Sequence, residues 1–437
     1  MKDSIAETKN NTGKTGSGLL SISPDRLCIG LYVQLDVSWM KHPFLFKNFL
    51  IKDEKQLQIL KSLNLEKISI NISRSKAEPL PPNKGGAETP DKSEIDVTVD
   101  VMMKEKQRRV KKLKARREKM VVCENNYRKT MAGVKSIVKK IRDTSPDTVK
   151  TAEGLVGSIV SSFLTDREAS MHLVNVKGND EDDHFHVVNV AVLSLMLGNA
   201  LMLEKDQLRK LGFSALFHDM GKSKIPAKVL RKKEKWTVAE RKLYEMHPEY
   251  GVEMGREIKS LPQEAFRVIA QHHEAVDGSG FPKGLKGGEI SAFAKIVRIA
   301  NTYDNYCNQI DPKKSMTPYQ AVSFMYAKER HKYEEEMLAA FISSLGVYPP
   351  GTILKLNEGS IGMVISVNQD VLLKPNILLY NPEIPKEEAV ILDLREEELS
   401  IEKTITPSSL KPEIFEYLNP SMNVNYFFEG KRNGSDK

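Results

Sequence analysis

Hydrophobic positions recur at helical spacing through the middle of the chain. Apolar residues such as Leu155 and Ile159 fall on one helical face, and similar spacing continues over residues 130–346. Thr237 followed by Glu240 has the spacing of a capping box that opens a helix. This pattern predicts a mainly α protein whose central domain, residues 130–346, is all-helical.

The flanking segments show different patterns. Residues 19–75 combine two strand-like stretches with one short amphipathic helix, which predicts a small α+β domain. Residues 347–437 alternate apolar and polar positions around turn residues, which predicts a small C-terminal β module and tail. Residues 1–18 are polar and are expected to be flexible. Residues 76–129 begin with a Pro, Gly and Lys-rich linker and continue as a basic helix.

One apolar run, residues 187–203, is long enough to test for a membrane span. It contains Asn189, Ser194, Gly198 and Asn199, and it lies at the short limit for crossing a bilayer. We therefore expect a buried core helix and no membrane span.

Composition and charge narrow the class further. The 437 residues carry a formal net charge of +8, which could attract a phosphate-bearing ligand. The basic block at 104–120 has no interleaved aromatic residues for base stacking, so we expect a solvated helix face and no nucleic-acid partner.

Three cysteines without paired spacing exclude a disulfide scaffold and a cysteine zinc finger. The N-terminus shows no signal-peptide pattern, and a cytoplasmic location is predicted.

Histidine and carboxylate residues form the most informative motifs. Of the nine histidines, five lie in or beside predicted helices with acidic, glycine or proline neighbours: His186, His218, His247, His272 and His273. Imidazole and carboxylate ligands suit Zn, Fe, Mn and similar divalent ions. A carboxylate such as that of Asp219 can bridge two ions, which imidazole cannot do. Five histidines with one aspartate exceed the needs of one ion and indicate a two-metal site of the kind that hydrolyses phosphoesters.

Together these motifs resemble one known family. The motif His218–Asp219 with Gly221–Lys222, then His247–Pro248, His272–His273–Glu274 and Asp277–Gly278–Ser279–Gly280–Phe281–Pro282 resembles the HD-GYP domain. This is the branch of the HD phosphohydrolases that hydrolyses cyclic di-GMP. The tyrosine of the family signature is Phe281 here, which lacks the hydroxyl.

The resemblance implies a metal-dependent phosphodiesterase and assigns roles by position. It implies that two divalent ions, iron or manganese, are held by His186, His218, Asp219, His247, His272 and His273, with Asp219 bridging. Asp219 and Lys222 are the expected catalytic residues, and Lys222 is expected to contact the substrate phosphate. The loop residues Asp277, Gly278, Gly280, Phe281 and Pro282 are expected to border the substrate, a cyclic dinucleotide that is cut to pGpG and in a second step to GMP.

The chain departs from the family pattern at several positions. Asn301 stands where a ligand aspartate is expected, so it offers a carbonyl oxygen without a negative charge. Ile310 replaces an expected arginine, while Lys313 falls near a second basic position for the substrate phosphates. Asp182 stands where some members place a glutamate for a third metal ion. These changes leave open an alternative: a weak or inactive module that binds cyclic di-GMP or another protein.

Two further resemblances concern the flanking segments. Residues 19–75 resemble the small domain that often precedes HD-GYP domains, and the segment after residue 346 resembles a small SH3-like β-barrel. We also expect two further kinds of partner. One is a second copy of the chain, which would bind through the helical stretch at 104–140, and the other is a signalling protein.

Overall fold

The computed structural model describes most of the chain in two compact units. The described residues are 19–38, 41–44, 47–82, 92–141, 146–165, 184–258, 261–311, 314–368, 370–382, 384, 386 and 389–418. One unit consists of residues 1–113 with 381–390, and the other consists of 114–380 with 391–437. The expected flexible N-terminus, residues 1–18, lies outside the described residues.

The N-terminal unit contains a small antiparallel sheet and one short helix, as its pattern predicts. Strands β1 (Leu19–Ile22), β4 (Ile68–Asn71), β2 (Tyr32–Gln34) and β3 (Asn48–Leu50) pair in the order β1-β4-β2-β3. Helix α1 (Glu54–Ser62) begins after Asp53, whose side chain accepts a hydrogen bond from the backbone N–H of Gln56. Apolar side chains from the sheet and from α1, including Val33 and Leu60, form the core of this unit.

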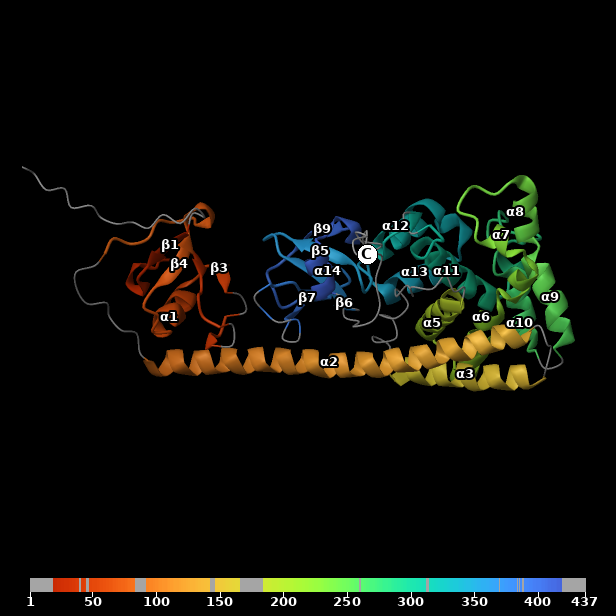
Figure 1. Cartoon of the computed structure of the whole chain (residues 1–437), viewed down its shortest axis with the longest axis horizontal. Helices are drawn as coiled ribbons and strands as arrows, with labels where there is room; N and C mark the ends of the chain where they lie inside the picture. Colours follow the sequence, from red (N-terminus) through yellow and green to blue (C-terminus); the bar gives the residue numbers. More distant parts are fainter. Residues whose placement is uncertain are drawn as a thin grey trace, which may run out of the picture. The chain divides into compact units, whose positions relative to one another are not determined.

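The basic block belongs to one long helix. Helix α2 (Lys92–Ile141) includes the whole basic stretch predicted to be helical (Figure 1). Near its start, Ile95 belongs to the core of the N-terminal unit. Lys106 is 2% exposed there and donates to the backbone carbonyls of His42 and Phe44, each at 2.9 Å. This helix is therefore held to the N-terminal unit by both apolar and polar contacts.

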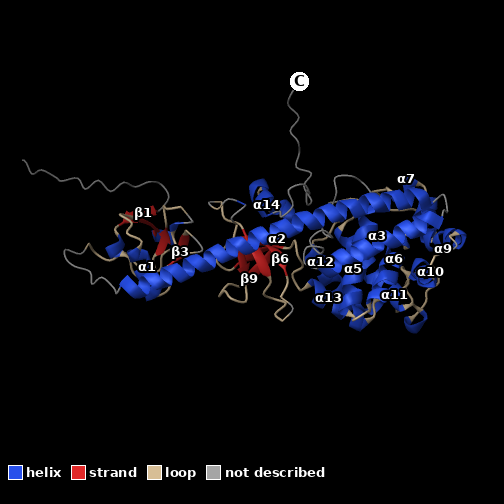
Figure 2. Cartoon of the chain, turned by 90° about the horizontal axis from the view of Figure 1, so that it is seen from below, coloured by secondary structure: helices blue, strands red, loops and turns tan. Residues whose placement is uncertain are grey.

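The central part of the chain is all-helical, which confirms the predicted mainly α class. Its helices are α3 (Pro146–Thr165), α5 (His184–Ala200), α6 (Lys205–Phe217), α7 (Ala227–Leu230), α8 (Val238–Glu245), α9 (His247–Glu257), α10 (Gln263–Gln271), α11 (Ala292–Cys307), α12 (Pro318–Glu329) and α13 (Glu335–Leu345). The predicted capping box of Thr237 and Glu240 opens α8. Figure 2 shows that the strands are confined to two sheets outside this helical part.

Helix α5 is the buried core helix that the apolar run predicted. Residues 187–197 are buried almost without interruption, and α5 packs against α6 and α11. Its polar members are also buried, including Asn189 at 1% exposure. Within the described part of the chain, no helix combines the length and apolarity needed to cross a bilayer.

The C-terminal segment forms a β module, but not the expected barrel. Strands β5 (Ile353–Leu356), β6 (Ile361–Ser366), β7 (Asn376–Leu379), β8 (Ile391–Asp393) and β9 (Ile401–Ile405) form an antiparallel sheet in the order β8-β7-β6-β5-β9. Helix α14 (Pro412–Leu418) follows. In the described residues the edge strands β8 and β9 do not pair with each other, so the sheet stays open and the SH3-like barrel is not confirmed.

Candidate metal centre and active site

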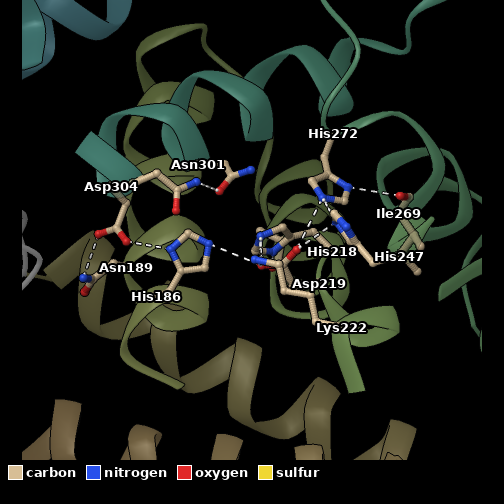
Figure 3. A network of polar contacts seen from close by, with 12 residues as sticks. His186, Asn189, His218, Asp219, Lys222, His247, Ile269, His272, Asn301 and Asp304 are labelled. Carbon is tan, nitrogen blue, oxygen red and sulfur yellow. Dashed lines mark hydrogen bonds and ion pairs between the residues drawn. The ribbon is translucent and has the colours of Figure 1, made fainter. Parts of the chain in front are cut away.

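His186, His218, His247 and His272 converge on Asp219 in the helical domain (Figure 3), and His273 belongs to the same cluster. His186 lies in the first turn of α5, and His218 follows the last residue of α6. Asp219 precedes a 3₁₀ turn, Met220–Lys224. His247 opens α9, and His272 and His273 follow the end of α10. The helical packing therefore brings together residues that are far apart in the sequence.

Asp219 lies at the centre of this cluster. Its Oδ2 atom is 3.4 Å from Nε2 of His186 and 3.2 Å from Nε2 of His218. Its Oδ1 atom is 3.3 Å from Nε2 of His247 and 3.4 Å from Nε2 of His272. Two ligand groups thus share Asp219: His186 with His218, and His247 with His272 and His273. A shared carboxylate between two groups of imidazoles is the arrangement expected of a two-metal site.

Backbone carbonyls orient three of the imidazole rings. Nδ1 of His218 lies 2.7 Å from the carbonyl oxygen of Ala215, and Nδ1 of His247 lies 2.7 Å from that of Tyr244. Nδ1 of His272 faces the carbonyl of Ile269 at 3.0 Å. Because Nδ1 donates its proton to these oxygens, Nε2 keeps its lone pair on the side of Asp219.

A carboxylate orients the fourth ring. Nδ1 of His186 lies 2.7 Å from Oδ2 of Asp304. Asp304 is 1% exposed, and its Oδ1 accepts hydrogen bonds from the side-chain amides of Asn189 and Asn308. The sequence analysis placed neither Asp304 nor Asn189 among the candidate site residues, although Asp304 matches the second acid of the family motif. One signal was present, because Asn189 follows His186 by three positions and so shares its helical face.

Several ring nitrogens in the cluster are buried without hydrogen bonds. Among the described residues, Nε2 of His186, His218 and His273 has no hydrogen-bond partner, and neither has Oδ1 of Asp219. Buried polar atoms normally have partners, since leaving them unpaired costs free energy. Imidazole nitrogens and a carboxylate oxygen that converge in this way fit divalent metal ions, so the cluster can hold metal.

The pKa values of most of these histidines favour the neutral form that binds metal. Burial lowers the pKa of His272 to about 4, against the attraction of Asp219. Burial likewise lowers the pKa of His218 and of His247. Burial also lowers the pKa of His186, but the nearby carboxylates of Asp219 and Asp304 outweigh this effect, and the pKa of His186 is raised to about 9.

The central carboxylate is held in its ionised form. Burial raises the pKa of Asp219, but the facing imidazole of His218 and the ammonium group of Lys222 lower it well below its usual value. Lys222 places Nζ 2.5 Å from Oδ2 of Asp219 and 5.5 Å from the centre of the Tyr244 ring. Its side chain is 22% exposed. Lys222 is therefore a cationic side chain of the cluster that also reaches solvent.

The remaining predicted site residues are distributed differently. Asn301 is 2% exposed, and its Oδ1 accepts a hydrogen bond from Nδ2 of Asn305 at 2.7 Å. It lies on α11, close to Asp304 (Figure 3). Ile310 is 51% exposed after the end of that helix. Asp182 and Lys313 lie outside the described residues.

The predicted substrate loop, residues 277–282, follows the paired histidines directly. Asp277 accepts hydrogen bonds from the backbone N–H and the hydroxyl of Ser279, at 2.9 and 2.7 Å. Gly278 has φ +83°, a conformation that favours glycine. Phe281 stacks on His273, with ring centres 4.4 Å apart. The loop therefore borders the cluster.

This helical domain with its shared aspartate has the architecture of a metal-dependent phosphohydrolase. Residues 162–337 match the family model of the HD domain, and residues 19–152 match that of a domain of unknown function, DUF3391. Residues 162–337 therefore carry an HD domain, and these similarities support the HD-GYP resemblance that the motifs predicted.

Curated relatives are similar over different lengths. The cyclic di-GMP phosphodiesterase PA4108 of Pseudomonas aeruginosa is 27% identical over 368 residues, which are 83% of this chain and 85% of the relative. The response regulator RpfG of Xanthomonas campestris, also a cyclic di-GMP phosphodiesterase, is 31% identical over 34% of this chain and 39% of its own length. A 3'3'-cGAMP-specific phosphodiesterase of Vibrio cholerae, number 2, is 30% identical over 40% of this chain and 34% of its own length.

Proposed function

We propose that this chain hydrolyses cyclic di-GMP to pGpG, with GMP as the product of a second cut, in bacterial second-messenger signalling. The observation that carries the proposal is the ionised Asp219, which lies between two groups of imidazoles with Lys222 beside it. The similarity to PA4108, which extends over most of both chains, supports cyclic di-GMP as the substrate.

Each group of residues has a distinct role in this proposal. His186 and His218 would hold one divalent ion, and His247, His272 and His273 would hold the other, with Asp219 shared. Iron or manganese is the expected metal. Divalent ions in such a site supply a nucleophile by lowering the pKa of water, and they offset charge on the phosphoryl group.

Lys222 is the residue best placed to meet the substrate phosphate. Its ammonium group lies beside the cluster at Asp219, and its side chain is partly exposed. A fixed positive charge at this position stabilises the negative charge that grows on the phosphoryl oxygens during hydrolysis.

Two other functions are supported by specific observations. The similarity to a 3'3'-cGAMP-specific phosphodiesterase makes a hybrid cyclic dinucleotide the second candidate substrate. Asn301 and Ile310 each remove a charge expected from the family pattern, which favours binding of cyclic di-GMP without turnover. Both alternatives keep a cyclic dinucleotide as ligand.

A single-turnover assay separates these functions. The protein, loaded anaerobically with iron or manganese, is mixed with cyclic di-GMP or 3'3'-cGAMP, and the products are resolved by chromatography. We expect pGpG from cyclic di-GMP, abolished by a chelator and by His218→Ala. Recovery of intact cyclic di-GMP from protein shown to contain metal would reject the proposal, and cleavage of 3'3'-cGAMP alone would favour the hybrid substrate.

A matched pair of lysine variants tests the proposed role of Lys222. Lys222→Met should slow the single-turnover rate about 100-fold, which is the order seen when one charge-stabilising group is removed. Lys224 is two residues further along the same turn and pairs with Glu253 at the surface. Lys224→Met should leave the rate within about twofold.

The other partners and the location remain predictions. They are a second copy of the chain, signalling proteins and the cytoplasm. A third metal ion at Asp182 and phosphate contact by Lys313 are likewise proposals that rest on sequence position.

A further inference from the structure

Glu274 belongs to the His272–His273–Glu274 motif but has no role in the function proposed so far. It is 0% exposed, although glutamate is rarely buried completely unless it is paired. Its Oε1 accepts a hydrogen bond from the backbone N–H of Lys283 at 2.7 Å. Its Oε2 accepts one from the backbone N–H of Leu285 at 2.9 Å. Both carboxylate oxygens thus hold the far end of the loop that starts at Asp277.

The near side of the same loop packs directly on the backbone that carries the histidines. The N–H of Phe281 donates to the carbonyl of His273 at 3.2 Å. A Cβ atom at Gly280 would lie 2.3 Å from the backbone nitrogen of Ala275 and 2.5 Å from Cα of Glu274. Only glycine permits this approach. Glu274 therefore closes a loop whose other side already rests on residues 273–275.

His273 differs from the other four histidines in how its ring is held. In the described structure, its ring nitrogens make no hydrogen bond, whereas each of the others has Nδ1 bonded to a carbonyl or carboxylate. Its ring instead lies nearly parallel to that of Phe281, with an interplanar angle of 17°. Its other ring contacts are inclined by 48° or more.

We propose that Glu274 is a positioning residue that clamps the 277–286 loop so that Phe281 fixes the orientation of the His273 imidazole. The clamp acts on the metal centre because Phe281 stacks on the His273 ring. The rings of the other four histidines are oriented by hydrogen bonds instead. Stacking requires an aromatic face but does not depend on a hydroxyl group, so phenylalanine is sufficient at position 281. The inference rests on the proposed role of His273 as a metal ligand, but the clamp itself is independent of catalysis.

Hydrogen exchange and metal titration test the two steps separately. In the metal-free full-length protein, Glu274→Ala should speed amide exchange at Lys283 and Leu285 about tenfold, the order expected when a charge-assisted hydrogen bond is lost. In a Mn²⁺ titration, Glu274→Ala and Phe281→Leu should weaken one of the two binding steps about tenfold, as for other residues that orient a ligand. Glu274→Gln keeps one acceptor oxygen. Its amide exchange rates and its Mn²⁺ affinity should therefore lie between those of the wild type and those of Glu274→Ala.

Two controls make the experiment specific. Phe281→Tyr retains the aromatic face and should bind Mn²⁺ as the wild type does. Glu358, an exposed glutamate in the C-terminal β module, accepts a local hydrogen bond from the hydroxyl of Ser360, so Glu358→Ala should change neither exchange nor binding. If Glu274→Ala fails to fold, as judged by circular dichroism, Glu274→Gln and Phe281→Leu decide the outcome.

The results that would overturn the inference are distinct from failure of the proposed function. Unchanged exchange at Lys283 and Leu285 in the Glu274 variants would reject the clamp. Faster exchange with unchanged Mn²⁺ binding, or unchanged binding in Phe281→Leu, would reject its action on His273. A wild type that binds Mn²⁺ but leaves cyclic di-GMP intact would reject the phosphodiesterase while the predicted changes in exchange and binding still support the clamp.

Discussion

Asn301 is a position at which the sequence departs from the HD-GYP pattern. Its buried side chain offers an uncharged amide oxygen, which already accepts a hydrogen bond from Asn305. A carboxylate in the same position could keep that bond and add a negative charge toward the cluster. The substitution therefore separates the effect of charge from the effect of geometry.

We expect Asn301→Asp to strengthen Mn²⁺ binding about tenfold, because a charged ligand replaces a neutral one near a cationic site. Isothermal titration of the full-length protein measures this change. The single-turnover rate should rise only if the wild type is a hydrolase. If neither affinity nor rate changes, Asn301 is not a metal ligand.

His186 makes metal binding depend on pH in a defined direction. The pKa of its imidazole is raised to about 9 in the metal-free protein, so it carries a proton below that pH. A metal ion must displace this proton, and Mn²⁺ affinity should rise about tenfold for each unit of pH between 6.5 and 8.5. Titrations across this range test the slope. Asp304→Asn removes a carboxylate that raises the pKa of His186, so this variant should show a smaller slope of Mn²⁺ affinity against pH. An unchanged slope would contradict the assignment of the pH dependence to His186.

At the scale of elements, most histidines of the candidate site lie at the ends of helices. His218 follows α6, His247 opens α9 and His272 follows α10. At the ends of these helices, last-turn carbonyls lack partners within the helix and can accept from Nδ1. The carbonyls of Ala215 and Ile269 are used in this way. Helix geometry thus selects the tautomer of the ligands.

Helix α2 is joined to the N-terminal unit through a buried lysine. Burial lowers the pKa of Lys106 to about 7. Between pH 7 and 10.5 the unfolded chain holds this proton more often than the folded chain, so the free energy of unfolding of this unit should rise with pH. Lys106→Met should abolish that contribution.

Urea denaturation at pH 7 and pH 9 measures this effect. The chain has two tryptophans, Trp39 and Trp236; residue 39 lies outside the described residues but within the sequence range 1–113 of the N-terminal unit. In a Trp236→Phe background, the fluorescence of Trp39 reports this unit in the full-length protein. In the protein that retains Lys106, we expect a higher urea midpoint at pH 9 than at pH 7. In the Lys106→Met variant, the difference between the two midpoints should be smaller. A midpoint shift of equal size in both proteins would assign it to other groups.

At the scale of the whole molecule, metal binding should stabilise the unit that contains the cluster. A ligand that binds only the folded state at 100 times its Kd adds about 2.7 kcal/mol to the free energy of unfolding. In a Trp39→Phe background, Trp236 reports this unit, and its denaturation midpoint should rise with Mn²⁺ and fall with a chelator. His218→Ala should show a much smaller rise. An equal rise in that variant would indicate binding elsewhere.

Much of this architecture could be predicted because it depends on local patterns. Helical spacing, capping residues and the buried run at 187–203 predicted the central helices, and alternation predicted the two β regions. The open sheet was not predicted, because whether β8 and β9 meet depends on strand tilt and register, which local alternation does not contain. The basic block was predicted as helical, but the burial of Lys106 depends on residues about 60 positions away.

The sequence by itself determined which residues offer groups that can bind metal. Its histidines and aspartate, with their neighbours, indicated a two-metal phosphohydrolase of the HD-GYP branch. Only the tertiary structure decided how these groups are oriented: the bond from His186 to Asp304, and the clamp by which Glu274 holds the loop above His273. The physical reason is that ligand identity is a property of residues, whereas ring orientation depends on contacts between helices and loops that only packing brings together.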